Sequence, residues 1–308
     1  MAGSPRWRDV GGPVGRLEPG ARNAITDVPG VRVGHAQAAG GQRTGVTVVA
    51  PPAVPARAGV AVVNGVGELT AKLEIDERGV IETPVYLCGS HAVGRVFEAA
   101  VLASGRGPDN VVLPVVGECD DGDMADSRMV SIGDVDKALA ALGPEVAEGS
   151  VGAGTGMICF DYPGGIGTAS RVVDGHHVGV LLLCNFGDRE YLDVPGLDVG
   201  PVSGKRSPHG SCIAVCATDA PLSAQQLRRL ALRPLLGLAR IGSYGAEGSG
   251  EIGLAFSAGS AQDLPTERLD PYFAAAYEAA HEAVYNCLVA ARPARRLDGS
   301  MQERFPLG

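Results

Sequence analysis

The chain has 308 residues, of which 45% are hydrophobic and 20% charged, the balance of a soluble globular protein with a sizeable core. Its formal net charge is −9 and no basic cluster occurs, which argues against nucleic acid and against an anionic membrane surface as partners. No apolar run approaches the roughly 20 residues of a membrane span, and the first residues lack the apolar stretch of a signal peptide.

The first half of the chain predicts an arm, several strands and two helices. Residues 1–23 are rich in Gly, Pro and Arg and predict a loose N-terminal arm. Beyond them, short Val- or Leu-rich runs bounded by Gly, Pro or Asn predict strands, several buried on both faces. These runs are residues 44–50, 59–65, 110–116, 177–185, 211–218 and 251–257. Ser90 can cap a helix over 91–104, and Asp134 can cap a second helix that follows it.

Two longer helices are expected in the second half. Within residues 223–241, one apolar stripe predicts an amphipathic helix that Pro234 should kink. Its members are Leu227, Leu230, Ala231, Leu235, Leu238 and Ile241. Apolar residues also repeat every three to four positions over 273–291. Strands covered by helices predict a layered α/β sandwich, and because no linker divides residues 1–308 we expect a single domain.

Cysteine and histidine usage points away from metal and disulfide chemistry. The seven cysteines are odd in number and lie mostly inside apolar strings, which favours reduced thiols in a cytoplasmic protein. No Cys-x-x-Cys occurs and the six histidines show no ligand spacing, so we expect no metal and no other cofactor.

The junction between Gly210 and Ser211 is the most informative place in the sequence. A polar, Gly/Pro-rich loop over 195–210 ends on Gly210, and Ser211 then opens an apolar strand. Glycine permits a strained backbone in which the serine hydroxyl can attack the preceding carbonyl. Cleavage there would place an α-amine, with a pKa of roughly 7.7–8.0, beside the hydroxyl as its general base. The alternative is an ordinary Gly-Ser turn. Neighbouring strand residues face opposite ways, so Cys212 should face the core.

Several segments resemble one enzyme family in the same order along the chain. They include VVNGVGELT (62–70), LPVVGE (113–118), GVLLLCNFGDR (179–189), ATDAPL (217–222) and GSGE (248–251). With these blocks the chain is similar to the L-aminopeptidase D-amidase/D-esterase (DmpA) family, which includes the β-peptidyl aminopeptidases. The resemblance implies a four-layer αββα sandwich of the N-terminal-nucleophile-hydrolase type. It also implies a homo-oligomer, commonly a tetramer of processed αβ pairs.

The resemblance also implies roles for particular residues. Members cleave themselves into two subunits, here 1–210 (α chain) and 211–308 (β chain), and the freed serine, Ser211, attacks the amide or ester of an N-terminal residue. Ser249 and Glu251 match the pair that orients the α-amine and relays its proton, as a nucleophile and its base require. Their alternative interpretation is a turn carrying a solvated acid.

Two further positions match the family's site. Asn185 matches the asparagine that helps hold the oxyanion, where an amide donor contributes ~3 kcal/mol; its alternative is a strand-end cap. Glu118 matches an acid that receives the substrate's free amine; its alternative is a structural salt bridge. Asp123 departs from the pattern, because it stands where relatives carry tyrosine. We expect Asp123 to favour a cationic substrate end.

The function expected from the resemblance is a self-processing serine aminopeptidase acting on small peptide, amide or ester substrates. Two alternatives stay open. The related ornithine acetyltransferase family transfers the acyl group to an amine rather than to water. The chain could also be an unprocessed, non-catalytic relative that binds metabolites.

Overall fold

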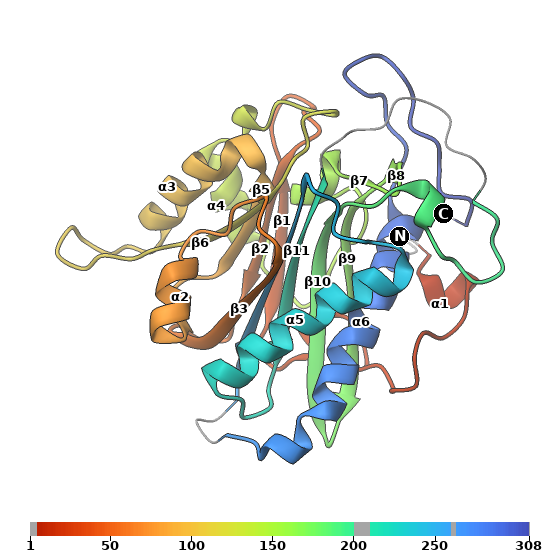
Figure 1. The fold of residues 1–308 in the computed structure, drawn as a ribbon. Helices are drawn as coiled ribbons and strands as arrows, with labels where there is room; N and C mark the ends of the chain where they lie inside the picture. Colours follow the sequence, from red (N-terminus) through yellow and green to blue (C-terminus); the bar gives the residue numbers. More distant parts are fainter. Residues whose placement is uncertain (1–4, 200–209, 260–262, 308) are drawn as a thin grey trace.

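The structure, a computed structural model, describes residues 5–199, 210–259 and 263–307, which build two stacked β-sheets between layers of helices (Figure 1). The smaller sheet contains, in spatial order, β1 (Arg32–Gln37), β2 (Gly45–Ala50), β5 (Val85–Gly89) and β6 (Val115–Cys119). The larger sheet contains β4 (Val80–Ile81), β3 (Ala56–Asn64), β12 (Ser249–Ser257), β11 (Gly210–Thr218), β10 (His176–Asn185) and β9 (Gly165–Val173). A short hairpin pairs β7 (Ile158–Cys159) with β8 (Tyr162–Pro163).

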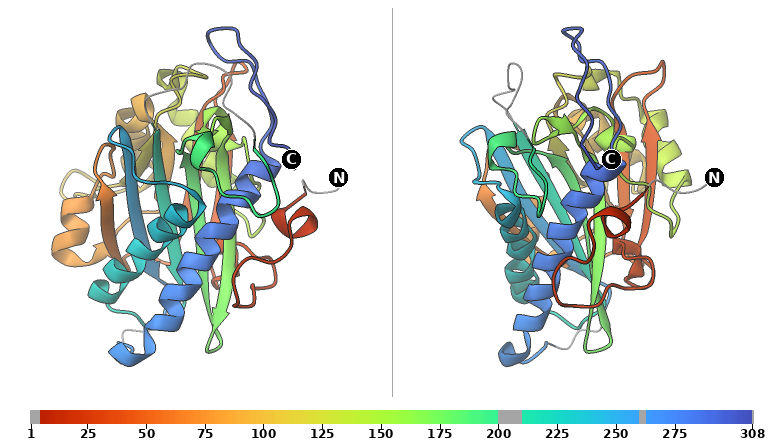
Figure 2. Two further views of the ribbon diagram at one scale, coloured as in Figure 1. Left: turned by 45° about the vertical axis from the view of Figure 1, so that its right-hand side comes forward. Right: turned by 90° about the vertical axis from the view of Figure 1, so that its right-hand side faces the viewer.

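The α-helices of the described residues are α1 (Trp7–Val10), α2 (Lys72–Arg78), α3 (Val93–Ala103), α4 (Ile132–Ala140), α5 (Ala224–Ile241) and α6 (Asp270–Ala290). Four of them, α3 to α6, cover the outer faces of the two sheets. Helices α5 and α6 pack on the larger sheet, whereas α3 and α4 pack on the smaller one, and the right-hand view of Figure 2 shows these layers edge-on. The predicted αββα sandwich is therefore confirmed. Among the described residues, no helix combines the length and the apolar character needed to cross a bilayer.

Strand β11 shows why the central strands are apolar on both faces. Ile213, Val215 and Ala217 belong to the core between the two sheets. The intervening residues Cys212 and Ala214 belong instead to the core between the larger sheet and α5 and α6. Because side chains alternate along a strand, each layer boundary is filled by every second residue.

The connection from β11 to β12 brings two distant segments to one edge. Helix α5 lies between these strands in the chain, and the strands pair in parallel. Parallel pairing requires such a crossover and aligns the amino ends of both strands. Strand β10 pairs with β11 in the antiparallel sense, so the carboxyl end of β10 arrives at the same edge.

The N-terminal arm is packed against the body of the protein, so the expectation of a loose arm is wrong for residues 5–23. Trp7 is buried and stacks on Tyr285 of α6, with 4.3 Å between ring centroids. The Arg6 Nε donates to Glu148 Oε2 at 2.7 Å. The sequence concealed this packing because the partners of the arm lie more than a hundred positions away.

A buried ionic network joins the arm, β9 and α6. Arg171 is fully buried and donates to Glu282 Oε2 at 2.8 Å and to Glu278 Oε2 at 3.3 Å. Burial raises the pKa of Glu282, but hydrogen bonds from Arg8 and the charge of Arg171 outweigh burial and hold it below its usual value. The network therefore stabilises the fold at neutral pH, and this contribution is lost as the pH falls through the lowered pKa.

Replacing Arg171 by methionine is expected to destabilise the protein by about 3–5 kcal/mol, because it leaves buried carboxylates without their cation. Equilibrium urea denaturation measures the change. The matched control is Arg240→Gln, which removes the exposed ion pair with Asp193 and should cost less than about 1 kcal/mol. Equal losses in the two variants would contradict a stabilising role for the buried network.

Two sequence predictions for the smaller sheet and its helices need correction. The strand expected at 110–116 begins only at Val115, because Pro114 has no N–H and Val111 is exposed. The helix expected after Asp134 begins at Ile132, and Ser131 stands at its N-cap. Asp134 instead accepts hydrogen bonds from the Ser131 N–H at 3.0 Å and from its hydroxyl at 2.7 Å.

The remaining helix predictions agree more closely. All six residues of the predicted stripe in α5 are buried. The helix runs through Pro234 without interruption, and its N-cap, Ser223, accepts a hydrogen bond from the Gln226 N–H. Ser90 does not cap the next helix; it starts a single 3-10 turn, and its hydroxyl turns toward Glu118.

Candidate active site

Ser211 lies at the amino end of β11 on the face that meets the smaller sheet. It is 3% exposed, and its Oγ forms no hydrogen bond of good geometry within the described residues. Burial raises the pKa of the Cys119 thiol well above its usual value, and the nearby Ser211 hydroxyl lowers it in part, although the two groups do not reach hydrogen-bond geometry. Cys212 faces the helices, as predicted. Ser211, the candidate nucleophile, is thus buried, and its hydroxyl is not held by a hydrogen bond within the described part of the chain.

Ser249 and Glu251 form a buried pair on the neighbouring strand. Gly210 pairs with Ser249 and Cys212 pairs with Glu251 across the parallel β11–β12 ladder. The Ser249 hydroxyl donates to Glu251 Oε1 at 2.5 Å. A methyl group placed on Gly210 would lie 3.3 Å from Ser249 Oγ. The pair therefore lies beside the Gly210–Ser211 peptide, on the face of the sheet opposite the Ser211 side chain.

The electrostatic state of Glu251 favours a cation nearby. Burial raises its pKa, and the hydrogen bond from Ser249 only partly offsets this. Its second oxygen, Oε2, is buried without a partner in the described part of the chain. A buried carboxylate with one unsatisfied oxygen costs free energy, so an ammonium group placed here would be stabilised.

Asn185 lies directly opposite Ser211 in the antiparallel β10–β11 register. Directly opposed residues share a face of the sheet. The Asn185 Oδ1 accepts from the Ile158 N–H at 2.8 Å, and its Nδ2 donates to the Asp120 carbonyl at 2.7 Å. An amide nitrogen carries two hydrogens, so these contacts fix the side chain and leave one donor. Asn185 is thus held by two hydrogen bonds and keeps one free N–H beside Ser211, the candidate nucleophile.

Glu118 approaches the same place from the smaller sheet. Its carboxylate accepts hydrogen bonds from the Glu68 N–H at 2.9 Å and from the Ser90 hydroxyl. A methyl group on Gly67 would lie 3.2 Å from Glu118 Oε1 and 3.7 Å from the Cα of Gly250, the residue paired with Ser211. Burial raises the pKa of Glu118, and the two hydrogen bonds lower it in part.

The alternative of a structural salt bridge finds no support at Glu118. In the described ranges, neither a lysine nor an arginine pairs with its carboxylate. Sequence reasoning missed Ser90 and the Glu68 N–H as its partners. The one available signal was the serine at the start of a helical segment, and that position predicts a cap rather than a contact with a carboxylate.

Asp123 faces a different part of the molecule from the other predicted residues. Its side chain is 42% exposed and lies 3.6 Å from Arg296 Nη1. Its carbonyl accepts from the Leu297 N–H at 3.0 Å. Arg296 already neutralises the carboxylate that we expected to attract a cationic substrate, so this role stays a prediction without a supporting contact. Asp121 lies inward instead, where burial raises its pKa to about 6.

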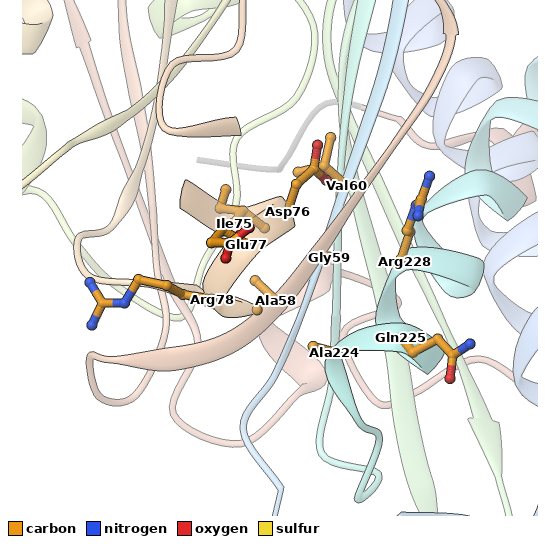
Figure 3. Close-up of a pocket in the computed structure, with 11 residues that line it drawn as sticks. Ala58, Gly59, Val60, Ile75, Asp76, Glu77, Arg78, Ala224, Gln225 and Arg228 are labelled. Atoms are coloured by element: carbon orange, nitrogen blue, oxygen red, sulfur yellow. The ribbon is translucent and has the colours of Figure 1, made fainter. Parts of the chain in front are cut away.

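Among the cavities lined by described residues, one near α2 adjoins this site and a second one does not. A mainly apolar cavity of about 570 Å³ is lined by Gly67, Glu68, Leu69, Leu113 and Ile252, next to the Glu118 carboxylate and to β12. A smaller cavity of about 300 Å³ lies between α2 and the start of α5 (Figure 3). None of the predicted site residues lines the smaller cavity. In Figure 3 the Arg78 side chain extends to the left, away from α5, and Arg228 lies on the other side of the cavity.

Comparisons with known proteins identify the relatives of this chain. The sequence model of peptidase family S58 matches residues 23–302. The β-peptidyl aminopeptidase BapA of Sphingosinicella microcystinivorans is 39% identical over 361 aligned residues, covering 99% of this chain and 90% of that protein. The PH0078 protein of Pyrococcus horikoshii OT3 superposes with a TM-score of 0.91 at 35% identity, covering 98% of this chain and 96% of that one.

A third relative is described as a serine aminopeptidase with a variant of the Ntn hydrolase fold. The L-aminopeptidase D-Ala-esterase/amidase of Ochrobactrum anthropi is described as a prototype of the serine aminopeptidases and a variant of the Ntn hydrolase fold. It superposes with a TM-score of 0.88 at 33% identity, covering 98% of this chain and 96% of that one. These matches confirm the resemblance found in the sequence. The chain belongs to peptidase family S58.

Proposed function

We propose that this chain is a serine aminopeptidase that cleaves its own Gly210–Ser211 bond and then removes N-terminal residues from small peptides, amides or esters. The observation that carries the proposal is the convergence of Ser211, the Ser249–Glu251 pair and Asn185 at one edge of the larger sheet. The names of the relatives support the class of reaction.

Self-cleavage uses the Ser211 hydroxyl, the Gly210–Ser211 peptide bond and one water molecule. The Ser211 Oγ attacks the Gly210 carbonyl carbon, and the C–N bond breaks as the Ser211 nitrogen takes up the hydroxyl proton. Water then hydrolyses the ester that links Gly210 to Ser211 Oγ. The products are a Gly210 carboxylate and a Ser211 residue with a free hydroxyl and a free α-amine.

Turnover uses the new α-amine as the general base. The Ser211 Oγ attacks the carbonyl of the substrate's N-terminal residue, and its proton passes through the α-amine to the leaving amine. Water then hydrolyses the acyl ester. Ser249 and Glu251 orient the α-amine. Burial raises the pKa of Glu251, and an ammonium group beside it would stabilise the charged carboxylate. The unused Asn185 donor supports the oxyanion, a contribution of ~3 kcal/mol.

Substrate recognition begins with the free amine. We place the substrate ammonium at Glu118, since this buried carboxylate has hydrogen-bond donors but no cation among its described neighbours. The adjoining apolar cavity offers room for the side chain or for the extra backbone carbon of a β-residue. This arrangement favours small substrates with an unblocked amine.

Glu118→Gln is expected to raise KM for free-amine substrates by about 100-fold, because an ammonium loses its charged partner. The change in kcat should be smaller. In the unmodified protein, KM should also rise as the pH falls through the raised pKa of Glu118, since the carboxylate loses its charge. Initial rates across a range of pH measure both effects. The control is Glu98→Gln on the exposed face of α3; an unchanged KM in Glu118→Gln would exclude this role.

We further propose a homo-oligomer of processed pairs acting in the cytoplasm. The exposed apolar side chains Val63, Val66, Leu73 and Val111 support a contact surface around α2. All seven cysteines are free and buried, which fits a reducing compartment.

The function is tested by the purified protein itself. A denaturing gel and intact mass should give two chains, 1–210 and 211–308. A panel of β-Ala, L-Ala and D-Ala p-nitroanilides should then release nitroaniline. A single uncut chain with full activity, or two chains with no activity toward any member, would refute the respective half of the proposal.

A further inference from the structure

A third cavity, of about 600 Å³, lies away from the candidate active site. It is open to solvent on one side and is lined by the segment before the 3-10 helix η4 (Gly152–Gly156), by Arg43 just before β2, and by Ala290, Arg292 and Pro293 at the end of α6. Its volume is in the range of small-molecule sites. None of the predicted catalytic residues lines it.

Arg6 and Glu148 form an ion pair on the cavity wall. Arg6 binds Glu148 through two bonds, Nε to Oε2 at 2.7 Å and Nη2 to Oε1 at 3.2 Å. Arg6 also donates to the carbonyls of Arg22, Asn23 and Thr168. This pair anchors the N-terminal arm, and because its two charges cancel it adds no net charge to the cavity wall.

Two other arginines on the wall have no such partner. In the described part of the chain, neither Arg43 nor Arg292 has a carboxylate within 4.0 Å or a hydrogen bond from its guanidinium. The only carboxylate on the lining, Glu148, is taken by Arg6. In a protein of net charge −9, two uncompensated guanidinium groups therefore border one cavity.

The rest of the lining is held in place and partly apolar. The Ser150 Oγ accepts from the Arg292 N–H at 3.2 Å, which fixes the backbone that carries this arginine. Val146, Val151 and Pro293 add apolar surface. A ligand that fits both kinds of wall carries an oxyanion at one end and an apolar body at the other.

We propose that this cavity binds a small organic anion whose carboxylate or phosphate is received by Arg43 and Arg292, with its apolar part against Val146, Val151 and Pro293. Guanidinium groups suit both oxyanions because their donors form a planar fork. The two arginines lie on either side of the Gly210–Ser211 bond in the chain. The ligand thus contacts both products of the proposed cleavage, although binding itself requires neither cleavage nor turnover.

Calorimetry with two probes tests the proposal. The probes are N-acetyl-L-alanine, whose blocked amine cannot use Glu118, and inorganic phosphate. N-acetyl-L-alaninamide serves as the neutral analogue. At least one anionic probe should bind and the amide should not. Stronger binding of the first indicates a carboxylate source for the natural ligand, and stronger binding of the second a phosphate source.

Matched variants locate the binding. Arg43→Gln and Arg292→Gln should each raise the Kd of the anionic probe by about 10-fold or more, because each variant loses one charged hydrogen-bond donor. Arg95→Gln, which makes the same charge change on the exposed face of α3, should leave the Kd unchanged, as should Glu118→Gln. The proposal is overturned if neither anion binds, if the amide binds equally well, or if Arg95→Gln weakens binding as much as the cavity variants.

Discussion

Ser211→Ala is expected to remain a single full-length chain and to lose at least about 10⁴-fold in kcat/KM. Alanine lacks the oxygen that attacks the Gly210 carbonyl, so neither the internal ester nor the free α-amine can form. The substitution fits the buried pocket without a clash, because it removes one atom that has no hydrogen bond of good geometry. Intact mass spectrometry reports the chain length, and p-nitroanilide hydrolysis reports the rate.

The adjacent residue provides a matched control for this variant. Cys212→Ala should be processed normally and keep its activity, because its side chain lies on the opposite face of β11, in the core next to the helices. The void that the removed thiol leaves in the core should lower the free energy of unfolding by about 1 kcal/mol. If Ser211→Ala were cleaved as the unmodified chain is, Ser211 would not be the nucleophile. If Cys212→Ala alone lost processing, the reactive group would have been assigned to the wrong face of the strand.

Glu251→Gln is expected to reduce kcat by about 10²- to 10⁴-fold, the range for an oriented acid–base group. Glutamine keeps the shape and can still accept from Ser249, but it removes the negative charge beside the α-amine. Loss of that charge lowers the amine's pKa, so the rising limb of the pH–rate profile should move to lower pH by about one unit. Single-turnover rates of the processed protein measure both changes.

Two further variants serve as controls for Glu251→Gln. Glu247→Gln changes an exposed acid four residues earlier and should alter neither kcat nor the pH profile. Ser249→Ala removes the hydrogen bond at 2.5 Å while keeping the carboxylate, so it should lower kcat with a smaller movement of the profile. A reduced kcat in Glu251→Gln with an unmoved profile would indicate a purely structural role for Glu251.

Much of the larger sheet follows from the sequence, because its strands are local patterns. Val- and Leu-rich runs bounded by Gly or Asn are sufficient to predict β10, β11 and β12. The start of β6 was misplaced because an apolar run masked the missing N–H of Pro114. The packed arm was missed for a different reason: the carboxylates that hold Arg6 and Arg8 lie far along the chain.

In the candidate site, too, some features follow from the local sequence and others depend on contacts between distant segments. A serine that opens an apolar strand is visible in the sequence, and the family resemblance suggested its partners. The register that sets Ser249 beside Gly210 depends on a parallel pairing of strands separated by α5, which no periodicity encodes. The contact of Ser90 with Glu118 joins two strand ends of the smaller sheet, and it likewise depends on tertiary folding.

The position of β11 and β12 within the larger sheet has a consequence for how the proposed two-chain form would unfold. These strands pair with each other, and their outer neighbours, β10 and β3, belong to the segment before Gly210. After the proposed cleavage, the two pieces would share one sheet and could not separate without breaking it. The precursor would therefore refold as a single molecule, whereas the mature pair would have to find its partner by collision. The proposed cleavage would thus turn a concentration-independent folding equilibrium into an association equilibrium, and recovery after denaturation would depend on dilution.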